Sequence, residues 1–135
     1  MKKLDSISLR ELGNIEKLAS CSCALRPTAA WESFTEDRWS AEKMVALGTL
    51  RDMAVYEPTH EEHHPEGTRY ASPNAPVAVD FFPYNVCDVY SCVACHQVVL
   101  RYTEFGGYYV DHRVRALDPS LVAEPLGLDS AKPTG

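Results

Sequence analysis

The chain has no long apolar segment and few positive charges. No stretch of its 135 residues approaches the ~18–20 consecutive apolar residues of a membrane-spanning helix. Lysine and arginine number 13 against 19 aspartates and glutamates, a net charge of −6. Nucleic acids are bound mainly through basic patches. We therefore expect neither a nucleic-acid nor a membrane partner, whereas a basic protein partner would be attracted.

Two motifs of common enzyme classes are also missing. Gly106-Gly107 lies between two predicted strands rather than before a helix, so no glycine-rich phosphate loop is present. No GxSxG nucleophile elbow occurs. The composition, 45% hydrophobic and 24% charged, is that of a globular protein. The length predicts one domain, residues 1–126, followed by a flexible tail over residues 127–135.

The first residues do not continue as a secretion signal. Lys2 and Lys3 resemble the start of one, but Asp5, Arg10 and Glu11 interrupt any apolar run that follows. We therefore expect a cytoplasmic protein. Five cysteines in a reducing compartment indicate metal binding, redox chemistry or burial rather than disulfides.

Local signals predict two helices near the N-terminus. The first spans about residues 8–20, where Ser8 and Glu11 match a capping box and apolar residues then recur at helical spacing. The second spans about residues 40–48, with Ser40 as its N-cap and a glycine suited to the left-handed stop.

Residues 52–85 predict a long loop. Five prolines interrupt every regular periodicity, and acidic side chains outnumber the single Arg69. A structureless run this long in a compact domain is usually functional or disordered. Aromatic side chains favour an ordered loop packed on the core, with a functional tip. These are Tyr56, Tyr70, Phe81, Phe82 and Tyr84.

Three strands are expected after the loop, at residues 86–91, 97–104 and 108–117. Polar and apolar residues alternate in the last two, and Gly106-Gly107 supplies a hairpin turn. Asp118-Pro119 then begins a last helical turn. The predicted fold class is α+β, with two N-terminal helices, a long proline-rich acidic loop and a three-stranded antiparallel β-meander that carries a CxxC knuckle.

A cluster of three cysteines and a histidine is the main candidate site. Cys92 and Cys95 form a CxxC between two predicted strands, where a knuckle places two thiolates on one zinc ion. The arrangement resembles half of a zinc ribbon, although the chain has no second CxxC. Cys87, His63 and His64 are our chosen candidates for the remaining ligands. Further candidates are Cys21, Cys23, His96 and His112.

Other interpretations of this cluster stay open. The spacing of Cys87, Cys92 and Cys95 is similar to the iron–sulfur run of plant-type ferredoxins, but no cysteine follows as fourth ligand. Cys92 to His96 also resembles the CxxCH string of c-type haem attachment, which requires export. Buried cysteines that bind nothing are the plain alternative, since free cysteine behaves as a small apolar residue.

The acidic loop contains a second candidate. His60, Glu61 and His64 spell HExxH, which binds zinc in metalloproteases when both histidines share one helix face. Pro65 follows directly and disfavours helical geometry at the residue before it, so at most one turn fits. The same histidines would otherwise complete a Cys2His2 site with the knuckle, or form a solvated loop.

On balance the sequence predicts a small, non-enzymatic binding or interaction protein with a structural zinc at Cys92 and Cys95. A metal-dependent hydrolase using the His60–His64 loop is the alternative, and an iron–sulfur electron carrier follows it. Arg101, Arg113 and Arg115 all stand at odd-numbered positions of two adjacent predicted strands. They predict one basic sheet face, paired with Glu104 and Asp111.

Overall fold

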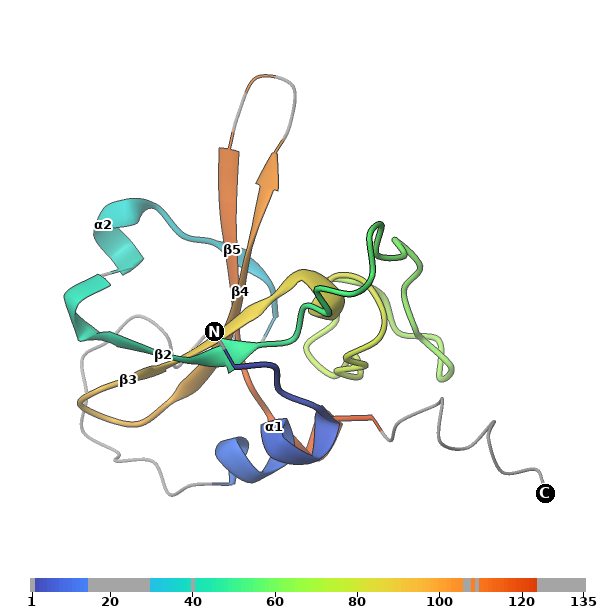
Figure 1. Cartoon of the computed structure of the whole chain (residues 1–135), viewed down its shortest axis with the longest axis horizontal. Helices are drawn as coiled ribbons and strands as arrows, with labels where there is room; N and C mark the ends of the chain where they lie inside the picture. The colour runs from blue at the N-terminus through green and yellow to red at the C-terminus, as the bar shows by residue number, and fades with distance from the viewer. Residues whose placement is uncertain (1, 15–29, 40, 106–107, 109, 124–135) are drawn as a thin grey trace.

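A computed structural model describes residues 2–14, 30–39, 41–105, 108 and 110–123. Its main element is a five-stranded antiparallel sheet with the strand order β1-β5-β4-β3-β2 (Figure 1). The strands are β1 (Glu32–Ser33), β2 (Met44–Thr49), β3 (Asp88–Cys92), β4 (Val98–Phe105) and β5 (Val110–Ala116). Two short helices, α1 (Ser6–Gly13) and α2 (Glu36–Trp39), accompany the sheet. The 3-10 turns are η1 (Ala41–Lys43), η2 (Tyr84–Val86) and η3 (Pro119–Leu121).

The predicted two helices and three-stranded meander are therefore wrong as a description of the fold. Helix α1 begins earlier than expected, because the side chain of Asp5, not Ser8, caps it and accepts a 2.8 Å hydrogen bond from Ser8 N. The predicted second helix, residues 40–48, is replaced by η1 and the edge strand β2. Strand β2 pairs with β3 from Met44↔Cys92 to Thr49↔Asp88, and this pairing overrides the local helix signals.

The three predicted strands lie close to β3, β4 and β5, but they do not form a sheet of their own. They are the middle of the five-stranded sheet, to which β2 and β1 add one strand at each edge. Asp118 caps η3 by accepting a hydrogen bond of 3.0 Å from Ser120 N. The chain between β2 and η2 contains no helix or strand, as expected for residues 52–85. Gly106-Gly107 and the predicted tail, residues 127–135, lie outside the described residues.

Each face of the sheet buries its own cluster. On one face Val89 and Leu100 pack with Leu9 of α1 and with Val77 of the long loop; we call this the α1 face. On the other, Cys92, Cys95, Val99 and Val114 pack with Phe34 and Trp39, and we call this the α2 face. Residues along a strand alternate between faces. A residue's place in the register therefore decides which cluster it joins.

Candidate functional site

The CxxC knuckle lies at the turn from β3 to β4. Cys92 and Cys95 are both fully buried in the cluster of the α2 face. The turn closes through hydrogen bonds from Cys92 N to Gln97 O, 3.0 Å, and from His96 N to Cys92 O, 2.8 Å. His96 has a φ of 65°, the left-handed conformation that such a tight turn requires. The knuckle thus brings two thiols to one buried cluster.

Cys87 lies on the opposite side of the sheet. It belongs to the α1-face cluster, and its Sγ donates a hydrogen bond of 3.2 Å to Pro83 O. Burial, and then the nearby charge of Asp88, raise the pKa of this thiol well above its usual value. The structure therefore does not bring Cys87 to the knuckle, and the three-cysteine arrangement of an iron–sulfur run is not assembled.

The loop histidines each have a partner of their own. His63 stacks on Phe81, with 4.9 Å between ring centroids. The two ring nitrogens of His64 lie 2.7 Å from Thr68 Oγ1 and 2.8 Å from a carboxylate oxygen of Glu62. Residues 60–64 form no helix, so the HExxH string lacks the shared helix face that its zinc chemistry needs.

Within the described ranges, no group of three or more histidine, cysteine, aspartate or glutamate side chains gathers as a metal site. Cys21 and Cys23 lie outside those ranges. The zinc site at Cys92 and Cys95, with His63 or His64 as further ligands, stays a prediction, whereas Cys87, the other residue chosen for it, packs in the cluster of the opposite face. Of its five chosen residues, only the two knuckle cysteines share a cluster.

The predicted basic face does not form. Arg101 stands opposite Val114 in the register and lies on the α2 face, where its guanidinium is 4.5 Å from the ring centroid of Trp39. Arg115 stands opposite Leu100 and is buried on the α1 face. Arg113 has the acidic partners that were expected for the set.

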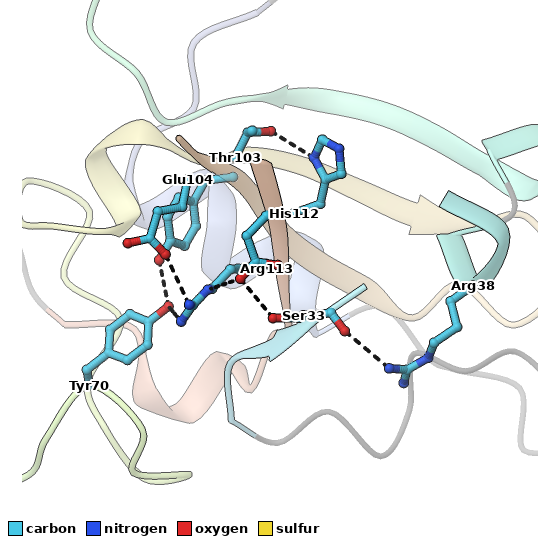
Figure 2. Close-up of polar contacts among 9 residues, drawn as sticks. Ser33, Arg38, Tyr70, Thr103, Glu104, His112 and Arg113 are labelled. Carbon is cyan, nitrogen blue, oxygen red and sulfur yellow. Dashed lines mark hydrogen bonds and ion pairs between the residues drawn. The ribbon is translucent and has the colours of Figure 1, made fainter. Parts of the chain in front are cut away.

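Arg113 is the centre of a polar network that ties the long loop to the sheet (Figure 2). It forms ion pairs with Glu104 at 3.1 Å and Asp111 at 3.0 Å. Its Nη1 also donates to the hydroxyl of Tyr70, at 3.4 Å. The hydroxyls of Tyr70 and Tyr102 share a hydrogen bond of 2.6 Å. Since Tyr70 comes from the loop and Tyr102 from β4, this bond fixes the loop on the sheet.

Arg115 anchors the loop a second time. Its side chain is 1% exposed, and its Nη2 donates to the carbonyl oxygens of Pro73, at 3.1 Å, and Ala75, at 3.0 Å. Its Nη1 donates to the hydroxyl of Tyr84. Tyr70, Phe82 and Tyr84 are thus anchors as predicted. Tyr56 is not, because it is 94% exposed.

Tyr70 and Tyr102, the two tyrosines beside Arg113, should make the folded protein less stable at high pH. Burial raises the pKa of Tyr70, and burial together with the Tyr70 hydrogen bond raises the pKa of Tyr102. In the unfolded chain both ionise near pH 10. The unfolded state then loses protons that the folded state still holds, so the free energy of unfolding should fall as pH rises above about 10. Urea unfolding between pH 8 and about 11 measures this, and Tyr102→Phe should flatten the decline.

A cavity of about 630 Å³ lies beside the start of the long loop. Met53, Val55 and Tyr56 line it and remain 81%, 47% and 94% exposed. The carboxylates of Asp52 and Glu57 stand beside them. We call the cavity-lining residues from Arg51 to Thr59 the 51–59 surface. Sequence reasoning placed a functional tip in the acidic loop but missed this part. The available signal was three large apolar residues within a polar, acidic stretch.

Comparisons with known proteins give no relative. The chain matches no protein family, and no curated protein or solved structure is significantly similar to it. No helix in the part of the chain that the structure describes is long and apolar enough to cross a membrane. Function must therefore be argued from the residues themselves.

Proposed function

We propose that this protein is a small, non-enzymatic binding protein that docks a basic protein segment on the 51–59 surface. The observation that carries the proposal is the exposure of Met53, Val55 and Tyr56 beside a 630 Å³ cavity. Exposed apolar groups gathered at a concavity are typical of interaction sites. Aromatic residues and methionine are also enriched at protein interfaces.

Charge favours a basic partner. The chain carries a net charge of −6, and Asp52 and Glu57 flank the exposed apolar side chains. Complementary charge around an apolar centre speeds association and selects among partners more than it adds affinity. A basic segment would thus be drawn to this surface and held by its apolar residues.

Selection of random displayed peptides against the full chain tests this proposal. We expect the enriched peptides to contain an excess of lysine and arginine, and to bind more weakly as salt increases. Tyr56→Ala should raise their Kd at least tenfold, about 1.4 kcal/mol, because Tyr56 is the largest exposed apolar group of the surface.

Tyr108→Ala is the matched control. Tyr108 is fully exposed but lies between β4 and β5, and it is not among the residues that line the cavity. Its replacement should leave the Kd unchanged. Peptides without a basic bias, or equal losses in both variants, would contradict the proposal.

A structural zinc at the knuckle is proposed as the second feature of this binding protein. The shared burial of Cys92 and Cys95 at one strand turn supports it, since structural zinc sites are commonly built on such turns. The zinc would stabilise the β3–β4 turn and the α2 face rather than take part in docking.

A further inference from the structure

Strand β4 has an edge that its neighbour leaves open. Strand β3 pairs with β4 only as far as Asp88↔Arg101, whereas β5 pairs with the other side of β4 up to Phe105↔Val110. Among the described residues, positions 102–105 therefore have a strand on one side only. An unpaired strand edge presents backbone N–H and C=O groups that can pair with another chain.

The hydrogen-bond pattern shows which groups this edge presents. Leu117 N donates to Val98 O at 2.9 Å, so the backbone polar groups of Val98 point toward β5. These groups alternate along a strand, so those of Thr103 and Phe105 point to the opposite, open side. No backbone hydrogen bond joins Thr103 or Phe105 to another described segment on that side. The edge thus offers both backbone groups of Thr103 and the N–H of Phe105.

A groove of about 370 Å³ lies at this edge. Its lining combines residues of the open edge with residues from outside β4, namely Tyr102, Thr103 and Phe105 with Arg51, Pro58 and Val86. Ligand pockets measure roughly 300–1,000 Å³. A groove at the lower end of that range admits a few residues of an extended chain rather than the sheet edge of a second folded copy.

The side chains of the groove favour alternating acidic and apolar residues. Arg51 and Arg101 line it against one carboxylate, Asp88, which already stands opposite Arg101 in the register. A strand beside β4 would direct its side chains to the two sheet faces in turn. Carboxylates would then lie toward Arg101 on the α2 face, and apolar side chains toward Val86 and Tyr102 of the α1-face cluster.

We infer that the groove binds an extended acidic and apolar segment of a partner protein as an additional strand beside β4. In such strand addition the main-chain hydrogen bonds give affinity and the alternate side chains give selectivity. The inference goes beyond the proposed function. The groove borders the 51–59 surface, since Arg51 and Pro58 line both cavities, but it binds a segment of different charge through a different set of atoms.

Titration of the ¹⁵N-labelled full chain with the peptide acetyl-Val-Glu-Val-Glu-Val-amide tests the inference by NMR. We expect the amide protons of Thr103 and Phe105 to move downfield in a saturable manner and to exchange more slowly with solvent, because each gains a hydrogen bond. The amide of Glu104 points toward β5 and is the internal control, so it should change less.

Backbone methylation of the peptide separates strand addition from docking by side chains. One peptide is N-methylated at both glutamates and another at the central valine, so the two lose N–H groups that point to opposite sides of the strand. One methylated peptide should bind at least tenfold more weakly than the parent, and the other about as well as the parent. Equal effects of the two methylations, or no shift at Thr103, would overturn the inference.

Variants of the full chain test the preference for acidic residues. Arg51→Gln should weaken the glutamate peptide at least threefold and leave its glutamine counterpart unchanged. Arg69→Gln removes an exposed arginine outside the groove lining and should change neither. Equal affinity of the wild-type chain for the two peptides would contradict the acidic preference. Tyr56→Ala should leave the glutamate peptide unchanged, so a failure of the basic-segment proposal and a failure of strand addition are seen separately.

Discussion

Replacing Arg115 with leucine should lower the free energy of unfolding by about 3 kcal/mol. The substitution removes the guanidinium that donates to Pro73 O, Ala75 O and the Tyr84 hydroxyl. Tyr84 is buried, and the side chain of Arg115 is 1% exposed, so water cannot replace the lost donors without opening the loop. A buried polar group left unsatisfied costs about 1–3 kcal/mol. Urea unfolding gives the change directly.

Arg113→Leu is the matched control for this prediction. Arg113 lies two residues away on the same face of β5, but its partners Glu104 and Asp111 are partly exposed. Ion pairs of that kind contribute about 0–1 kcal/mol. Hydrogen exchange should separate the two variants further. In Arg115→Leu we expect faster exchange of Ala75 N–H, which donates to Ser72 O within the anchored segment. Equal losses in the two variants would contradict an anchoring role for Arg115.

Local periodicity predicted only those strands that form a local meander. Strands β4 and β5 pair across one short connection, so alternation and turn residues describe them well. Strand β2 pairs with β3 across the whole acidic loop, a contact that no local signal encodes. Its sequence from Met44 to Thr49 suits a helix or a strand, and a capping signal before it favoured the wrong choice. The long-range pairing decided the structure.

Register explains why the arginines were assigned to one face incorrectly. The pairing of β4 with β5 places Tyr102 opposite Arg113, so residues of opposite parity share a face. Arg101 and Arg113 have the same parity and therefore lie on opposite faces. The sequence does not reveal the register of a hairpin whose turn length is unknown. Odd and even positions within one strand correctly predicted which residues share a face of the sheet. Comparing odd and even positions between two strands did not, because that depends on the register.

Candidate-site residues could likewise be placed from the sequence where their contacts are local, and not where those contacts depend on the long-range fold. The knuckle was predictable because Cys92 and Cys95 are separated only by their own turn. The place of Cys87 was not, because it depends on which face of the sheet each residue joins.

Cys92→Ser should abolish zinc binding if the knuckle holds a structural zinc. We expect the full chain, purified without chelator, to contain about one equivalent of zinc, the stoichiometry of a single tetrahedral site. Loss of either knuckle thiolate breaks that site, so Cys92→Ser and Cys95→Ser should retain almost none. Mass spectrometric metal analysis measures the content. Chelation should also lower the Tm of the wild-type chain, because metal binding is coupled to folding in structural sites.

Cys87→Ser is the control that makes this test specific. Cys87 is as buried as the knuckle cysteines but packs in the α1-face cluster, so its replacement should leave the zinc content unchanged. Retention of zinc in Cys92→Ser, or its absence from the wild-type chain, would contradict the zinc proposal. The knuckle thiols would then be apolar packing groups beside Phe34 and Trp39. If zinc is present, its loss from His63→Ala, His64→Ala, Cys21→Ser or Cys23→Ser would identify the remaining ligands, since a closed site needs four donors.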